Sequence, residues 1–410
     1  MSREFFSALT VAEALAGFRP ARRTAVEPVL REDLLHRVPA ADVVAPHALP
    51  GFARSTVDGY AVRAADTYGS SDGLPAYLEL AGAVRMGQAP EAKVPPHGAV
   101  AIPTGAVLPD GADAVVMVEY TAETMPGTIE VTRPVAPGGG VIRADDDVPT
   151  GGVLVQSGRP LRAPDLGLLA AAGVAAVEVH ARPRVVILST GDEVVSPDTP
   201  ELTAGQVRDA TASALAGLVR AAGGEPVYGG IVADEKDALV EALRGALTGA
   251  DLVVISAGSS VGARDETATA VAELGEIWCH GLAIKPGKPT ILAECAGVPL
   301  IGLPGNPLSA LVVFRLVGVP LVWQLAGCEQ PPPQPRTRAR LARNVASQAG
   351  RLDVVQVRLV DSPEGGFCAE PLHGPSALLS VLARADGCVV IPEAATGLDG
   401  GAEVDVDLYA

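Results

Sequence analysis

The sequence has few of the residues that most often carry redox, zinc or nucleophilic chemistry. Its five cysteines are odd in number and show no CxxC spacing, which argues against both a disulfide framework and a zinc site. Its six histidines form no HxxxH pair and no Ser/His/Asp arrangement, and aromatic residues make up only 3% of the chain. We therefore expect buried free thiols and no mechanism based on histidine.

Long apolar runs and excess positive charge are also absent. No run approaches the roughly 20 uninterrupted apolar residues of a membrane span, and residues 1–22 lack the apolar stretch of a signal peptide. The 31 basic and 48 acidic residues give a formal charge of −17, and such a field repels nucleic acid and anionic lipid. We expect a cytoplasmic protein with neither nucleic acid nor membrane as a partner. An anionic substrate would need a locally positive site.

Aliphatic residues and turn formers are plentiful. Apolar residues make up 48% of the 410 positions, and a chain much longer than about 250 to 300 residues usually divides into domains. The 46 glycines and 35 prolines lie mostly between apolar runs, where turns belong. These features predict an α/β multidomain protein.

The N-terminal part predicts two domains, one inserted in the other. Residues 51–143 carry short β-like runs separated by Gly, Pro and Asp, which indicates a β-rich inserted domain. The flanking segments 1–50 and 144–180 would form one mixed α/β domain. Within them, residues 1–38 show apolar residues at helix spacing in two stretches, with Pro20 ending the first. Residues 1–20 could instead pack on the next domain.

Residues 181–327 show the clearest pattern, in which wholly apolar strands alternate with helices. The expected strands are 185–188, 227–232 and 252–255, and the expected helices are 210–222, 237–247 and 266–274. This alternation predicts a parallel, doubly wound sheet covered on both faces, with its ligand beyond the carboxyl ends of the strands. A proline-rich linker at 331–335 then leads into a small C-terminal β-domain, within residues 328–410.

Two loops of the parallel domain could bind anions. The loop after the third strand offers backbone and hydroxyl donors at a helix N-terminus, which suits phosphate; its candidate residues are Ser256, Gly258, Ser259, Ser260 and Gly262. Taken alone, such a loop is only a turn in most α/β proteins. Lys285 and Lys288 flank a rigid Pro-Gly and could present two charges to phosphate oxygens, the alternative being solvated surface lysines.

Carboxylates follow the same strands. Glu193, Asp234 and Asp265, with Asp192 nearby, would meet at one sheet edge, and oxygen ligands in that number suit Mg²⁺ bound to a substrate phosphate. Single carboxylates after strands are often helix N-caps instead. For Asp265, directly before the expected helix, both interpretations stay open.

Taken in order along the chain, these segments resemble the molybdopterin molybdenumtransferase family, which comprises the bacterial MoeA proteins and the C-terminal part of gephyrin. The matching segments are Ser55–Ala61, Pro103–Ala106, Arg143–Asp147, Ser189–Glu193, Ser256–Asp265, Ala283–Pro289, Leu303–Pro307, Ala385–Gly387 and Ile391–Pro392. Each motif is weak alone, but their order over essentially the whole chain is specific.

The resemblance implies a reaction and a set of residues. Members take adenylylated molybdopterin and molybdate, cleave the pyrophosphate link with release of AMP, and leave molybdenum on the dithiolene sulfurs. The implied catalytic positions are Asp58, Thr104, Asp147, Glu193 and Asp265. The implied binding positions are Asp234, Lys285, Lys288, Pro304 and Pro307, with Mg²⁺ expected at Glu193, Asp234 and Asp265.

The resemblance also implies a homodimer, because the β-rich domain of one subunit faces the parallel domain of the other. The molybdopterin adenylyltransferase that supplies the substrate is a further expected partner. Departures from the family pattern stand at Ala53, Arg54, Asp145, Asp146, Thr211, Ala257 and Pro375. Two alternatives are a molybdopterin adenylyltransferase using ATP, which needs only the parallel domain, and a non-catalytic cofactor carrier or scaffold.

Overall fold

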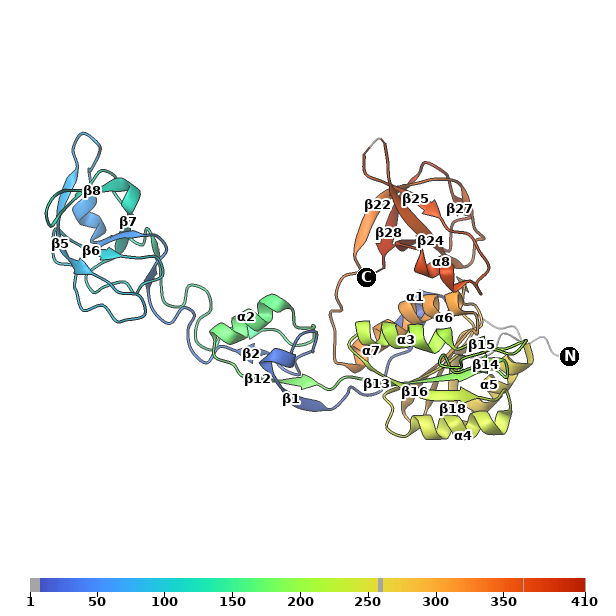
Figure 1. Cartoon of the computed structure of the whole chain (residues 1–410). Helices are drawn as coiled ribbons and strands as arrows, with labels where there is room; N and C mark the ends of the chain where they lie inside the picture. The colour runs from blue at the N-terminus through green and yellow to red at the C-terminus, as the bar shows by residue number, and fades with distance from the viewer. Residues whose placement is uncertain (1–7, 257–260, 364, 410) are drawn as a thin grey trace.

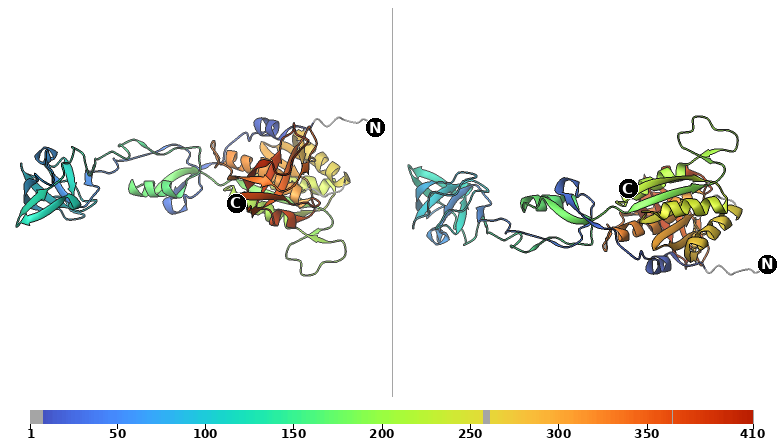
Figure 2. Two further views of the ribbon diagram at one scale, coloured as in Figure 1. Left: turned by 90° about the horizontal axis from the view of Figure 1, so that it is seen from above. Right: turned by 90° about the horizontal axis from the view of Figure 1, so that it is seen from below.

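The computed structural model describes residues 8–256, 261–363 and 365–409. The molecule is elongated in every view (Figure 1 and Figure 2). A β-rich domain lies at one end and a small mixed domain lies in the middle. An α/β sheet with its helices lies at the other end, together with the C-terminal β-domain.

Helix α1 (Val11–Gly17) packs on the α/β domain at the far end of the molecule. A capping box starts it, because Glu13 N donates to Thr10 Oγ1 at 3.1 Å and Thr10 N donates to Glu13 Oε2 at 2.8 Å. Val11 and Phe18 are buried in the core beside Phe314. The described residues that precede the middle domain therefore belong to the α/β domain.

The prediction of a second helix before residue 38 is wrong. Residues Val26–Leu30 form strand β1, which pairs antiparallel with β12 (Ala176–His180), and only a short 3₁₀ turn follows at Arg31–Asp33. Pro28 lacks the N–H that an interior helical position needs, and Val26 and Val29 are β-branched. The pairing of β1 with the distant strand β12 therefore determines the structure here, rather than the helix-like spacing of a few apolar residues.

The middle domain consists of the β1–β12 ribbon, a second ribbon of β2 (Val43–Val44) and β11 (Val153–Val155), and helix α2 (Ala163–Ala171). Gly173 adopts a φ of 71° just after α2, a conformation that suits glycine at a helix end. Two antiparallel segments lead from here to the β-rich domain, where Leu49 N donates to the Val148 carbonyl at 2.8 Å.

The β-rich domain contains a six-stranded sheet in the order β7-β4-β6-β5-β9-β8. Its strands are β4 (Gly59–Val62), β5 (Ala76–Ala83), β6 (Gly98–Ile102), β7 (Ala114–Met117), β8 (Thr121–Met125) and β9 (Thr128–Val131). A two-stranded ladder of β3 (Arg54–Ser55) and β10 (Val141–Ile142) closes its base. Two long segments connect this β-rich domain to the middle domain (Figure 1).

The α/β domain is built on a sheet in the order β16-β13-β17-β21-β20-β18. The first four strands, β16 (Glu225–Val232), β13 (Arg184–Thr190), β17 (Leu252–Ser256) and β21 (Val298–Leu303), are parallel. However, β20 (Ile291–Cys295) runs antiparallel to β21, and the edge strand β18 (Gly275–His280) is antiparallel to β20, so the sheet is mixed rather than wholly parallel. A two-residue turn forces this reversal, because Ala296 and Gly297 both adopt positive φ, 51° and 77°.

Helices cover both faces of this sheet. Helices α3 (Ala210–Ala221), α6 (Pro307–Val313) and α7 (Val319–Leu325) share one core, and α4 (Lys236–Leu247) and α5 (Val261–Leu274) share the other. The apolar segment Pro307–Leu325 has the length and composition of a membrane span, yet 61% of its most apolar window is buried inside the domain. Since α5 begins at Val261 rather than at residue 266, Gly262 and Asp265 lie inside the helix and not in the preceding loop.

The C-terminal domain has a six-stranded sheet that includes one strand of the α/β domain. Its own strands are β22 (Arg336–Leu341), β24 (Leu352–Asp361), β25 (Phe367–Pro371), β26 (Gly387–Ile391) and β28 (Glu403–Leu408), with helix α8 (Leu379–Ala383). The short strand β19 (Ile284–Lys285) pairs in parallel with β24. The segment that carries the two lysines is therefore fixed to the C-terminal domain.

Candidate functional site

The carboxyl ends of the four parallel strands meet at one edge of the α/β sheet. Ser189 stands opposite Ser256 in register, Ser256 stands opposite Leu303, and Thr190 stands opposite Val232. The loops that carry Glu193, Asp234 and Pro304 therefore leave the sheet side by side. Ser256 ends its strand as a buried residue, and Pro307 opens α6 a few residues after Pro304.

Acidic side chains gather at this edge. Asp234 N donates weakly to Asp192 Oδ1 at 3.4 Å. Burial raises the pKa of Asp234, and the nearby charges of Asp192 and Glu193 add to the shift, while a hydrogen bond from Thr190 opposes it. Within the described part of the chain, Asp234 Oδ1 is buried without a hydrogen-bond partner. An unpartnered carboxylate oxygen beside two further carboxylates fits a cation.

The predicted three-carboxylate site remains a prediction. Among the side chains that the structure describes, no three His, Cys, Asp or Glu residues form a group that could hold a metal ion. The side chain of Asp265 lies outside the described residues, and so do Gly258, Ser259 and Ser260 of the loop before α5. The structure thus brings Glu193 and Asp234 together, and it does not test Asp265 as the third ligand.

Asp209 is a buried carboxylate close to the same edge, but it has a structural role. It accepts hydrogen bonds from Ser189 Oγ at 2.6 Å and from the Tyr228 hydroxyl at 3.2 Å, and it caps α3 through Ala212 N at 2.9 Å. Burial together with Asp209 raises the pKa of Tyr228 to about 12. Because its oxygens are satisfied, Asp209 is not a candidate ligand.

The two lysines flank a tight turn that only glycine fits. Gly287 has a φ of 122°, and a Cβ at this position would lie 2.3 Å from Val313 Cγ2. Thr290 Oγ1 donates to the Gly287 carbonyl at 2.7 Å, and Thr290 N donates to the Lys288 carbonyl at 2.9 Å. The turn is therefore rigid, while Lys285 and Lys288 themselves are exposed.

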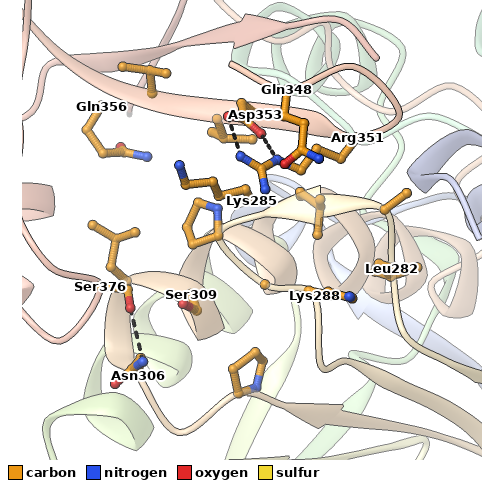
Figure 3. A pocket seen from close by; sticks show the side chains of 18 of the residues that line it. Leu282, Lys285, Lys288, Asn306, Ser309, Gln348, Arg351, Asp353, Gln356 and Ser376 are labelled. Atoms are coloured by element: carbon orange, nitrogen blue, oxygen red, sulfur yellow. Dashed lines mark hydrogen bonds and ion pairs between the residues drawn. The ribbon is translucent and has the colours of Figure 1, made fainter. Parts of the chain in front are cut away.

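This turn forms one wall of a pocket of about 970 Å³ between the α/β domain and the C-terminal domain. Figure 3 shows Lys285 and Lys288 on the segment of the α/β domain and, above them, Arg351, Asp353 and Gln356 from the C-terminal domain. Pro304 also lines the pocket. The residues from the C-terminal domain were not predicted, because nothing in their local spacing indicates that β24 pairs with β19.

Most polar groups in the pocket are paired. Arg351 Nε donates to the buried Asp353 at 2.8 Å, and Asn306 Nδ2 donates to Ser376 Oγ at 3.0 Å (Figure 3). Lys285 and Lys288 have no ion-pair partner among the described residues. The pocket therefore carries a net positive charge in a protein whose overall charge is −17.

Asp58 and Thr104 form a second group in the β-rich domain. Asp58 Oδ1 accepts hydrogen bonds from Thr104 N at 2.7 Å and from Thr104 Oγ1 at 3.0 Å. These bonds, the backbone one first, lower the pKa of Asp58. Asp147 lies apart from them, on the connecting segment, where its N–H donates to the Leu49 carbonyl at 3.1 Å.

Within one chain, the group of Asp58 and Thr104 does not meet the candidate residues of the α/β domain. Figure 1 places the β-rich domain at the opposite end of the molecule from the α/β sheet. The structure thus brings together Glu193 with Asp234, Lys285 with Lys288, and Asp58 with Thr104. It does not bring Asp58 and Thr104 near the residues of the α/β domain within one chain.

Comparison with known proteins accounts for the order of these domains. Residues 9–173 match the family model for the MoeA N-terminal region (domain I and II). Residues 186–324 match that for a probable molybdopterin binding domain, and residues 338–409 match that for the MoeA C-terminal region (domain IV). The fold and the site thus define a multidomain protein built around a molybdopterin-binding type of α/β domain. The chain belongs to the MoeA family.

Curated relatives and solved structures agree with this assignment. The molybdopterin molybdenumtransferase 1 of Mycobacterium tuberculosis is 35% identical over 394 residues, covering 90% of this chain and 92% of its own length. The molybdopterin molybdenumtransferase of Haemophilus influenzae is 35% identical over 322 residues, covering 78% of each chain. A crystal structure of a molybdopterin biosynthesis MoeA protein from Pyrococcus horikoshii matches with a TM-score of 0.84 at 28% identity, covering 98% of this chain and 100% of that one.

Proposed function

We propose that this protein is a molybdopterin molybdenumtransferase acting in molybdenum cofactor biosynthesis. The observation that carries the proposal is the basic pocket of Lys285 and Lys288, which is also lined by Pro304 from the strand-end edge of the sheet, in a chain 35% identical to relatives of that name. In the finer form of the proposal, adenylylated molybdopterin and molybdate are the substrates, AMP is released, and molybdenum stays on the dithiolene sulfurs.

The basic pocket would hold the anionic groups. Lys285 and Lys288 are ammonium groups on a rigid turn, without an ion-pair partner in the described part of the chain, and such groups attract phosphate and other tetrahedral oxyanions. In an acidic protein this local charge reversal concentrates anions where the pocket opens. We assign molybdate to this pocket, with the phosphates toward the sheet edge.

The acidic edge would hold Mg²⁺. Asp234 and Glu193 supply carboxylate oxygens there, and the unpartnered Asp234 Oδ1 fits such an ion. When bound, Mg²⁺ would neutralise charge on the phosphoryl oxygens of the bond to be cut. The attacking oxygen would come from molybdate or water.

Asp58 would act as an ionised carboxylate. Its two hydrogen bonds from Thr104 lower its pKa, so it stays charged and able to accept a proton or a hydrogen bond at neutral pH. Thr104 would orient this carboxylate. Asp147, on the connecting segment, would face the same ligand from the base of the β-rich domain.

A homodimer would bring Asp58 to the lysines. The β-rich domain of one chain lies far from its own α/β sheet (Figure 1). The β1 strand of the middle domain also exposes apolar side chains, with Val26 50% and Leu30 56% exposed, and an apolar strand face of this kind favours contact with another chain. We therefore propose that each site combines the lysines of one subunit with the Asp58 of the other.

Cross-complementation tests both the reaction and the shared site. AMP release from adenylylated molybdopterin would be measured with Mg²⁺ and molybdate for Asp58→Ala, for Lys285→Ala, and for the two after unfolding and refolding together. Each variant alone should be inactive. Random pairing makes half of the dimers mixed with one intact site of two, so about a quarter of wild-type activity should return.

Three outcomes would refute parts of this proposal. No recovery in the mixture, with both variants folded, would place Asp58 and Lys285 in the same subunit's site or outside it. Adenylylation of molybdopterin from ATP by the wild-type protein would favour an adenylyltransferase. Tight binding of substrate without AMP release would indicate a carrier.

A further inference from the structure

Gln356 has an amide group with an unused donor. The residue lies in β24 and is 3% exposed, yet it lines the pocket between the two domains. Its Nε2 is buried and finds no hydrogen-bond partner anywhere in the described ranges. Figure 3 shows this nitrogen on the side that faces the amino group of Lys285. A buried donor without an acceptor is costly, so a ligand that accepts its hydrogen bonds is favoured.

Tyr409 determines which end of the amide faces the pocket. Its hydroxyl donates to Gln356 Oε1. Burial raises the pKa of Tyr409, so the hydroxyl keeps its proton and remains a donor at neutral pH. Because the oxygen of the amide is engaged, the NH₂ group is the end left for the pocket.

Tyr409 is itself held by the α/β domain. The Arg315 guanidinium lies 4.1 Å from the centre of the Tyr409 ring, and Arg315 Nη2 donates to the Leu408 carbonyl at 2.6 Å. Tyr409 N donates to the Asp386 carbonyl at 2.9 Å. The ring therefore spans the contact between the two domains that form the pocket.

The other groups nearby favour an anion as the missing acceptor. Lys285 is a cation, and Arg351 is compensated by Asp353. We propose that Gln356 binds the tetrahedral oxyanion substrate through Nε2, and that Tyr409 is the positioning residue that turns this nitrogen toward it. The proposal rests on the assignment of molybdate to this pocket. It gives the site a neutral donor from a segment far from the lysines in sequence.

A double-mutant cycle tests the two roles with molybdate as the probe. Equilibrium dialysis would give the molybdate affinity of the full-length protein, of Gln356→Met, of Tyr409→Phe and of the double variant. Losing a hydrogen bond to a charged ligand should weaken binding about 10- to 100-fold in Gln356→Met. Tyr409→Phe keeps the ring over Arg315 and should weaken binding about 3- to 10-fold, because the amide can then rotate. In the double variant, loss of the hydroxyl should have no further effect.

Controls separate the possible failures. Gln330→Met changes an exposed glutamine just before the linker and should leave molybdate affinity unchanged. If the folded wild-type protein does not bind molybdate, the assignment of this pocket in the proposed function is wrong. If it binds and Gln356→Met binds equally well, only the role of Gln356 is wrong. If Tyr409→Phe weakens binding equally in both backgrounds, Tyr409 acts on the fold and not through Gln356.

Discussion

The turn between the two lysines offers a sharp test of the site's geometry. Gly287 has a φ of 122°, a region that costs a residue with a Cβ about 1 to 3 kcal/mol. In addition, the new Cβ of Gly287→Ala would lie 2.3 Å from Val313 Cγ2 and 3.3 Å from Ile284 Cγ2. Overpacking of this kind costs typically about 1 to 3 kcal/mol. We expect Gly287→Ala to destabilise the α/β domain by about 2 to 6 kcal/mol.

A matched control isolates the steric part. Gly297 also has a positive φ, 77°, but an added Cβ would meet no atom within 4 Å. Gly297→Ala should therefore lose only the backbone contribution, about 1 to 2 kcal/mol. Thermal unfolding would measure both variants, and each kcal/mol corresponds to a shift of roughly 2 to 4 °C in the Tm of a domain of this size.

A second substitution tests the cause directly. Val313→Ala removes the methyl group that the new Cβ would strike, at the expense of a buried core contact. The two changes together should therefore destabilise the domain less than the sum of each alone, by about 1 to 3 kcal/mol. Equal losses in Gly287→Ala and Gly297→Ala, or strict additivity with Val313→Ala, would refute the reasoning. Molybdate affinity should fall with Gly287→Ala, because the turn sets the positions of both lysines.

Three further predictions concern charge and assembly. Asp234→Asn should raise the Tm at pH 7 while abolishing Mg²⁺-dependent turnover, because the raised pKa means that ionised Asp234 opposes folding. The gain in Tm should shrink as the pH falls and wild-type Asp234 takes up its proton, and a gain that is independent of pH would contradict this. Thr104→Val removes one of the two donors that lower the pKa of Asp58, so the acid limb of the pH–rate profile should move to higher pH; an unmoved limb would show that Asp58 is not the group titrated. Leu30→Asp should shift the protein toward monomer in sedimentation velocity, whereas Leu74→Asp, 71% exposed on the β-rich domain, should not.

Much of the α/β domain could be predicted from local pattern. The expected strand 252–255 is observed as Leu252–Ser256 and the expected helix 210–222 as Ala210–Ala221, since each is an apolar run with clear limits. Strands β18 and β20 were missed because strands of only six and five residues carry little periodic signal. The turn that reverses the chain before β21 is Ala-Gly, which lacks the Asn or Asp that usually marks such a hairpin.

The arrangement of the candidate site could be predicted where its residues share one turn or follow adjacent strands of the sheet. Lys285 and Lys288 stand on one turn, and Glu193 and Asp234 follow the adjacent strands β13 and β16. Asp58 lies in an ordinary Asp-Gly turn and was expected only from the family resemblance. Gln356 and Tyr409 come into the pocket through pairing of β24 with β19 and through the packing of the chain's last residues on Arg315. These contacts join distant segments, and an amide beside a phenol has no characteristic spacing that would indicate them.

The unpaired atoms of the site explain how one ligand could join its parts. Asp234 Oδ1 is an acceptor and Gln356 Nε2 is a donor, and both are buried without a partner in the described part of the molecule. Asp234 follows β16 at the carboxyl edge of the sheet, and Gln356 lines the same pocket as Pro304, which follows β21 at that edge. A bare anion would satisfy only the donor, and a bare cation only the acceptor. A phosphate-bearing substrate that arrives with a divalent cation and an oxyanion satisfies both, so the polar groups left unpaired here match the combination of ligands that the proposed reaction requires.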